Sequence, residues 1–314
     1  MKQFKNILCV VMNEKMSGPT LERAVSLAEN NQAKLTIMNV VTRARTPISA
    51  NSKTAMKADY MQSLNSFVAP FRQRLDIQYD VLMGTGFLEI IRSVLRNGYD
   101  LVIKAAENPD FMERLFGSDD MHLLRKCPCP VLLTKPEAKP NYDCILAAVD
   151  FDMNTPSTEE QELNQHILDL SSSLALSQFA AFHLVHAWDA VGEITVRTWS
   201  DNPSAAALNY INNERSYHQK GLDHLRQQLK EQIGTEAYDH LSPHFHLKQG
   251  AATTVIPETA KLLQADLVIM GTVARTGISG LLIGNTAETI LEQLRCSVLA
   301  IKPIGFVSPV RLTD

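Results

Sequence analysis

The sequence predicts two consecutive α/β domains, each an open parallel sheet wound on both faces by helices. Three observations support this fold class. The chain has 314 residues, enough for two domains of ordinary size. Its two halves match each other in register, and short apolar runs alternate with helical patterns in each half. Such alternation implies right-handed βαβ crossovers, so we expect doubly wound domains at 1–137 and 141–305.

The repeat between the halves fixes the expected strands. The matching pairs are 7–11 with 145–149, 35–41 with 182–188, Gly84 to Ile103 with Gly250 to Ile269, and Gly117 to Pro136 with Gly284 to Pro303. The short apolar runs among them have the composition of buried parallel strands. The connection 135–140 holds two prolines and charged residues, which interrupt regular structure, so we place the domain boundary there.

Helices are predicted where apolar residues recur three and four positions apart, as they do in 20–30 and 211–233. The longer segments 42–74 and 189–228 follow the second strand of each half and are rich in Met, Leu, Tyr and Ala. A segment at this place in the sheet can roof a cavity, so a carrier or sensor of an apolar or amphipathic metabolite is one hypothesis. Simple core packing is the alternative explanation.

Composition narrows the classes of partner. Hydrophobic residues make up 45% of the chain and charged residues 20%, which is typical of a folded protein. The net charge of -4 and the lack of a dense Lys/Arg run argue against direct binding of nucleic acid. The apolar run 7–12 is too short for a signal-peptide core, and no run reaches the roughly 20 residues that span a bilayer. With five scattered cysteines, we expect a cytoplasmic protein without a membrane partner.

A glycine-rich loop in the second half is the strongest candidate for a binding site. In doubly wound sheets, ligands bind beyond the carboxyl ends of the strands. There the fourth strand, 266–270, leads into the segment 271–286, and a helix is expected after it. Backbone N–H groups of such a loop can approach phosphate oxygens, and the start of the helix adds the positive end of a dipole. A plain loop whose glycines only make turns is the alternative.

This loop, with the apolar strand before it and Cys296 to Pro303 after it, resembles the C-terminal signature of the universal stress protein family. The resemblance implies tandem domains of the Rossmann-like, adenine nucleotide alpha hydrolase-like type. In nucleotide-binding members the loop reads Gly, two residues, Gly, nine residues, Gly, then Ser or Thr. By position Gly271 and Gly284 match, Ala274 replaces the middle glycine, and Asn285 stands where Ser or Thr is expected, with Thr286 next. The loop is therefore only partly retained, and ATP or another adenine nucleotide is the expected ligand.

The resemblance also implies other contacts and a way of packing. Asp150 falls at the end of the first strand of the second half, where the family places an aspartate near the nucleotide, although it could instead cap the next segment. His186 to Trp188, at the end of the second strand, would lie by the adenine or belong to the core. The expected nucleotide-binding residues are Asp150, Ala187, Met270, Gly271, Val273, Ala274, Gly284, Asn285 and Thr286. Family members often pair through the last strand, which implies an internal pseudo-dimer of the two halves and leaves a homodimer of whole chains open.

The first half departs from the family pattern. Met12 stands in place of Asp150, and the glycine after the fourth strand is replaced in 104–107. Gly117-Ser118 survives but is followed by Asp119 and Asp120, whose carboxylates would repel a phosphate. We expect no nucleotide in this half.

Two further clusters are weaker candidates. His240, His244 and His246 could bind zinc, but a solvated turn around Pro243 explains them as well, and we predict no metal. The Cys127-Pro128-Cys129 run is interpreted as buried small hydrophobes. No nucleophile elbow, Walker lysine loop or His-Glu-x-x-His motif occurs. We therefore predict a binding protein rather than an enzyme, with Asp150 as the one evident base for slow ATP hydrolysis.

Overall fold

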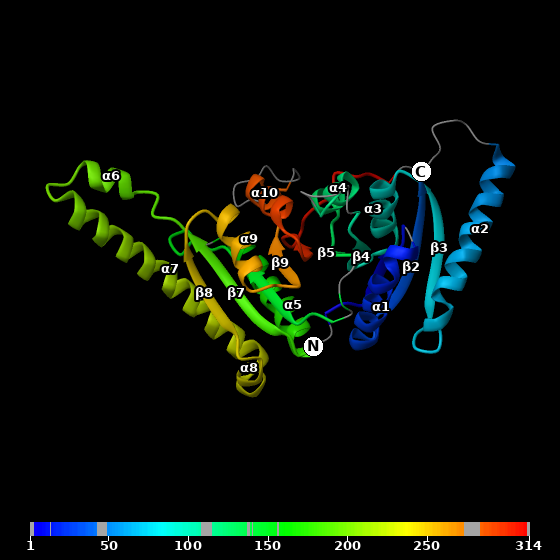
Figure 1. Ribbon diagram of the computed structural model, residues 1–314, viewed down its shortest axis with the longest axis horizontal. Helices are drawn as coiled ribbons and strands as arrows, with labels where there is room; N and C mark the ends of the chain where they lie inside the picture. The colour runs from blue at the N-terminus through cyan, green and yellow to red at the C-terminus, as the bar shows by residue number, and fades with distance from the viewer. Residues whose placement is uncertain are drawn as a thin grey trace.

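The computed structural model describes residues 3–12, 14–42, 49–107, 115–136, 139, 141–155, 157–272 and 283–312. The strands within these residues form one ten-stranded sheet in the order β3-β2-β1-β4-β5-β10-β9-β6-β7-β8. Figure 1 shows helices covering both faces of this sheet and the two halves opening away from each other. The predicted α/β fold class is confirmed, with the addition that the two domains share a single sheet.

The described elements follow the predicted order in each half. The first half consists of β1 (Asn6–Val10), α1 (Glu14–Asn31), β2 (Lys34–Thr42), α2 (Ala50–Val68), the 3-10 helix η1 (Ala69–Phe71), β3 (Ile77–Gly84), α3 (Gly86–Asn97), β4 (Leu101–Ala105), α4 (Ser118–Lys126) and β5 (Val131–Thr134). The second consists of β6 (Cys144–Ala148), α5 (Thr158–Gln178), β7 (Ala181–Trp188), α6 (Glu193–Thr198), α7 (Pro203–Ile233), α8 (Thr235–Leu241), β8 (His244–Gln249), α9 (Ala252–Leu262), β9 (Leu267–Gly271), α10 (Asn285–Gln293) and β10 (Ser297–Ile301).

The two halves meet through their last strands. Among the described residues, every strand pair is parallel except β5 with β10, which is antiparallel. Leu132 lies opposite Leu299, and the flanking pairs exchange places when the halves are exchanged, so an approximate twofold axis passes here. An ion pair between Arg125 of α4 and Glu288 of α10 adds a second link across the junction. The halves therefore pack as the internal pseudo-dimer that the resemblance implied.

The core consists of two apolar layers, one on each face of the sheet. Strand side chains alternate between the faces, so Ile145 and Ala147 join one layer while Leu146 and Ala148 join the other. Helices α1, α2, α5 and α7 cover the first layer, and α3, α4, α9 and α10 cover the second. Each fully buried aliphatic side chain contributes about 1.5–3 kcal/mol. Each apolar layer contains side chains from both halves, so the two domains share a continuous hydrophobic core.

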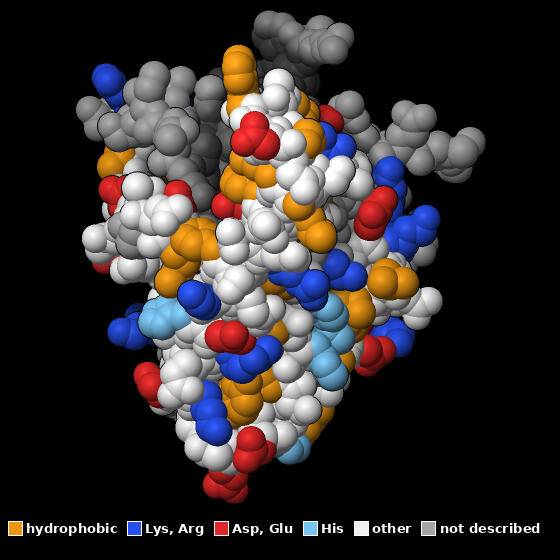
Figure 2. Space-filling view, turned by 90° about the vertical axis from the view of Figure 1, so that its left-hand side faces the viewer, with side chains coloured by type: hydrophobic (Ala, Val, Ile, Leu, Met, Phe, Trp, Pro, Cys, Tyr) orange, Lys and Arg blue, Asp and Glu red, His pale blue; other side chains and the backbone are white. Residues whose placement is uncertain are grey.

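Part of the second half stands away from the sheet. Figure 1 shows α6 and the beginning of α7 projecting from the body at the left, and Figure 2 views the molecule from this side, with hydrophobic side chains among exposed charges. Val191, Ile194 and Trp199 on this projection are 86%, 78% and 84% exposed. In the described part of the chain, no helix is long and apolar enough to cross a membrane.

Candidate functional site at the carboxyl edge of the second half

Neighbouring parallel strands bring most of the predicted residues to one edge of the sheet. Strand β6 pairs with β7 on one side and with β9 on the other. Asp150, Ala187 and Gly271 therefore lie at the carboxyl ends of three adjacent strands. Met270 precedes Gly271 and is buried. Gly284 joins them through a hydrogen bond from its backbone N–H to the carbonyl oxygen of Thr272, at 2.9 Å. The predicted Val273 and Ala274 lie outside the described residues.

The start of α10 presents backbone donors. Gly284 is the residue before the helix, with φ -65° and ψ 144°, and it carries no side chain that could cap it. The exposed residues Asn285 and Thr286 follow, and then the buried Ala287. No described side chain accepts a hydrogen bond from the first N–H groups of this helix. Because these groups have no partner within the helix and lie at the positive end of its dipole, the site favours an anion.

Asp150 is accessible at this edge. Its side chain is 67% exposed, with a carboxylate oxygen 4.0 Å from Nδ1 of His186. Asn164 of α5 fixes the strand end by donating from Nδ2 to the Asp150 carbonyl oxygen, at 2.8 Å. Helix α5 is capped by Ser157, whose hydroxyl accepts from the Glu160 N–H at 3.1 Å. Asp150 is thus not the N-cap of the next helix, and its carboxylate faces solvent.

A buried stack of rings separates α7 from the sheet beside this edge. His186 is 1% exposed and stacks on Phe151, with ring centroids 3.9 Å apart. Its Nε2 lies 2.9 Å from Nδ1 of His218 on α7, and His218 stacks on Trp188 at 5.5 Å. His186 and Trp188 point toward α7, whereas Ala187 packs with the layer under α9 and α10. Ala187 alone of these three therefore shares a face with α10, and Trp188 belongs to the core.

Sequence reasoning missed a buried lysine next to the loop. Lys302 follows β10 and is 5% exposed, and its Nζ donates to the Thr272 hydroxyl oxygen at 2.7 Å. The Phe306 ring centroid lies 4.9 Å from the same Nζ. Burial lowers the pKa of Lys302 to about 8, because the charged form loses its water. Its only sequence signal is that a lysine follows the last strand in both halves.

The matching place in the first half is filled by the chain itself. Asp120, the third residue of α4, is fully buried, and its Oδ2 accepts from the backbone N–H groups of Gly117 and Glu107 at 3.1 and 2.8 Å. Its Oδ1 accepts from Nζ of the buried Lys104 at 2.6 Å. Burial raises the pKa of Glu107, the Lys104 ammonium opposes this, and the carboxylates of Asp120 and Asp119 add to the rise. The carboxylate that was predicted to repel phosphate is therefore buried at the start of α4 and bound to Lys104.

The two halves differ at the positions of the buried carboxylate and of the lysine that pairs with it. Ala287 stands in α10 where α4 has Asp120, and Met270 stands in β9 where β4 has Lys104. The second half therefore has neither the internal carboxylate nor its lysine partner. Glu288, the one acidic residue in the first turn of α10, is paired with Arg125.

The predicted histidine cluster is divided by the fold. His244 and His246 lie on β8 and His240 on α8, while His183 of β7 stacks between the two strand histidines. Nδ1 of His183 is 3.0 Å from Nε2 of His246, and burial, with these neighbours, lowers the pKa of His183 to about 4. The described residues contain no group of three or more ligands that could hold a metal ion. Cys127 and Cys129 are both buried free thiols, as interpreted from the sequence.

Comparison with known proteins gives full-length matches. The universal stress protein family model matches residues 3–135 and 141–302. The chain is 30% identical over 327 residues to universal stress protein E of Escherichia coli strain K12, covering 100% of this chain and 99% of the relative. The universal stress protein E homolog of Haemophilus influenzae is 30% identical over 317 residues, covering 96% and 98%. A putative universal stress protein from Pseudomonas aeruginosa UCBPP-PA14 superposes with a TM-score of 0.71 at 27% identity, covering 96% and 94%.

Proposed function

The chain belongs to the universal stress protein family, and from that membership we propose that it is a cytoplasmic stress-response protein that binds one adenine nucleotide, ATP in the first instance. The start of α10 and the segment 271–286 would hold the phosphates, with Asp150 and Ala187 beside the rest of the nucleotide. The first half binds none. Its role is to complete the shared sheet through β5.

The main observation behind this proposal is that the position of Asp120 in the first half is taken by Ala287 in the second. Where Asp120 is present, its carboxylate takes the backbone N–H of Gly117 and the ammonium of Lys104. In the second half Ala287 stands in this place, the Gly284 N–H donates to the Thr272 carbonyl oxygen instead, and no described side chain accepts from the first N–H groups of α10. A phosphate group of a nucleotide supplies the charge that Asp120 supplies in the first half.

Binding, rather than turnover, is the activity that the site supports. Hydrolysis needs a base within hydrogen-bonding reach of a water beside the phosphate. Asp150 is the only acidic side chain among the predicted nucleotide-binding residues, and it lies at the end of a different strand from the loop. Release of phosphate from ATP, measured over hours, would show a slow hydrolase and contradict this part of the proposal.

Titration calorimetry with Mg-ATP tests the proposal. We expect one nucleotide per chain and an at least tenfold weaker Kd for Gly284→Val, since the added side chain enters the space in front of the α10 N–H groups. Gly284 has an ordinary negative φ, so valine introduces no backbone strain. Gly18→Val is the control, because an added Cβ there meets no atom within 4 Å. The proposal fails if wild-type protein takes up no ATP at millimolar concentration, or if Gly284→Val binds it as tightly as wild type.

A carrier of an apolar metabolite is the rival function, and one observation favours it. Val191, Ile194 and Trp199 are exposed on the projection that follows β7. An apolar ligand lying against that projection would cover them. Native mass spectrometry of the freshly purified chain separates the two functions, because a lipid-like mass would support the carrier and a nucleotide mass the first proposal.

A further inference from the structure

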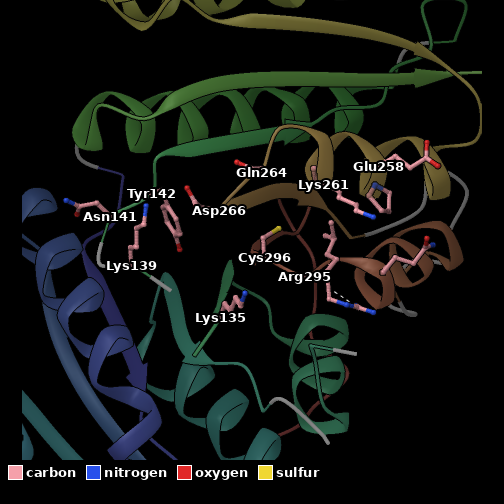
Figure 3. Close-up of a pocket in the computed structure, with 15 residues that line it drawn as sticks. Lys135, Lys139, Asn141, Tyr142, Glu258, Lys261, Gln264, Asp266, Arg295 and Cys296 are labelled. Carbon is pink, nitrogen blue, oxygen red and sulfur yellow. Dashed lines mark hydrogen bonds between the residues drawn. The ribbon is translucent and has the colours of Figure 1, made fainter. Parts of the chain in front are cut away.

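A groove of about 770 Å³ lies at the junction of the two halves, at the opposite end of α10 from Gly284. Figure 3 shows Lys135 entering it from the first half, while Tyr142, Lys261 and Arg295 enter from the second. Tyr142 precedes β6 and Arg295 precedes β10, so the groove lies along the amino edge of the second half, away from the nucleotide site. Its volume is that of a pocket for a metabolite-sized molecule.

Cationic side chains outnumber acidic ones around the groove, and two of the lysines have no carboxylate partner among the described residues. Of its two acidic residues, Asp266 is committed to the backbone N–H groups of Asp143 and Cys144, at 2.8 and 3.0 Å. Among its cations, Lys139 pairs with Asp143 at 2.5 Å. Within the described residues, neither Lys135 nor Lys261 has a carboxylate partner. A chain with a net charge of -4 thus keeps a local cationic site, which attracts an anion.

The side chains beneath the groove are buried. Leu294 and Tyr142 lie there, each 1% exposed, and the Arg23 guanidinium lies over the Tyr142 ring, 3.5 Å from its centroid. The Tyr142 hydroxyl oxygen is buried too, close to the Ser297 side chain. A ligand in the groove therefore meets the exposed side chains of Lys135 and Lys261 rather than this ring.

The approximate twofold axis relates Lys135 to a lysine of the second half whose surroundings are known. Lys135 and Lys302 are equivalent, since each follows the last strand of its half. After Lys302 the chain turns back with Phe306 over the ammonium, and Val310 packs onto the second core layer. After Lys135 the chain leaves instead to form β6, and the lysine stays exposed. In the second half the chain therefore places an aromatic ring, that of Phe306, beside the lysine that corresponds to Lys135.

From these observations we propose that the junction groove binds an aromatic organic anion, with its acidic group held by Lys135 and Lys261 and its ring beside Lys135, as the Phe306 ring lies beside Lys302. Because the lysines come from different halves, the bound anion would also bridge the junction. The proposal is independent of the nucleotide site, since it uses none of the residues at the carboxyl edge.

Fluorescence titration with the aromatic sulfonate 8-anilinonaphthalene-1-sulfonate tests the groove. We expect saturable binding that weakens at least tenfold in the double variant Lys135→Gln/Lys261→Gln. Lys139→Gln, which removes an exposed lysine already paired with Asp143, should bind like wild type. Uncharged N-phenyl-1-naphthylamine should bind more weakly than the sulfonate, because it lacks the group that the lysines hold.

Three results would overturn the proposal. The first is equal sulfonate binding by the double variant and wild type, which would place the probe elsewhere, for example on the exposed projection around Trp199. The second is equal binding of the neutral and the charged probe. The third is loss of sulfonate binding in Gly284→Val, which would place the probe at the nucleotide site. All the substituted lysines are at the surface, so unchanged melting temperatures should accompany the expected result.

Discussion

Replacing Ala287 by aspartate would give the second half the internal anion of the first. Ala287 is the third residue of α10, as Asp120 is of α4. In the first half this carboxylate lies within 3.1 Å of the backbone N–H that precedes its helix. Ala287→Asp therefore places a negative charge where we propose that phosphate binds, without the lysine that pairs with Asp120, since Met270 stands in its place.

The size of the effect follows from Coulomb's law. Two unit charges about 4 Å apart, at an effective dielectric constant of about 20, repel by about 4 kcal/mol. Rotation of the new side chain toward solvent and screening by salt reduce this, so we expect a loss of about 1.4–2.8 kcal/mol, or about ten- to hundredfold in Kd. Ala287 is buried and Met270 replaces the lysine that neutralises Asp120, so the new carboxylate lacks a partner and the melting temperature should fall as well.

Calorimetric titration with Mg-ATP, paired with thermal denaturation, measures both effects. Ala287→Asn is the matched control, because it adds a side chain of the same size without the charge. The reasoning is refuted if the folded aspartate variant binds ATP like wild type. It is refuted equally if the asparagine variant loses as much affinity as the aspartate variant, since size and not charge would then be responsible.

Three other perturbations test the electrostatic account. Asp120→Ala should lower the free energy of unfolding in urea by about 3 kcal/mol by stranding buried Lys104, and adding Lys104→Met should restore most of it. The neutral form of His183 is favoured by folding, so stability should be full above pH 6.5 and fall toward pH 4, and His183→Gln should flatten this slope in urea titrations at each pH. Lys302 is charged at a cost below about pH 8, so Lys302→Met should raise the melting temperature at pH 7.

The fold could be predicted because its signals are periodic and repeated. Buried parallel strands such as Ile145 to Val149 are continuous apolar runs, and each has a partner in the other half. The pairing of β5 with β10 was implied only by family resemblance, since no local pattern distinguishes an antiparallel junction from two separate sheets. The exposed projection at α6 was not predicted either, because its apolar residues read as core.

The strand ends that carry the candidate site could be predicted, but their side-chain contacts could not. Asp150, Gly271 and Gly284 do lie at one edge, as strand-end rules require. The inward turn of Asp120 onto Lys104 joins residues from different elements, and only the packed structure shows it. The same holds for the contact of His183 with His246, which depends on the register of β7 against β8. The assignment of Val273 and Ala274 to the nucleotide stays a prediction.

The central claim is that the two halves differ in whether the helix start after the fourth strand is open to an external anion. A crystal structure of the chain with a non-hydrolysable ATP analogue tests it most directly. We predict triphosphate density at the N–H groups of Asn285 and Thr286, with Asp120 unmoved beside Lys104. Density for the analogue at the start of α4, or full occupancy somewhere other than the start of α10, would contradict the account.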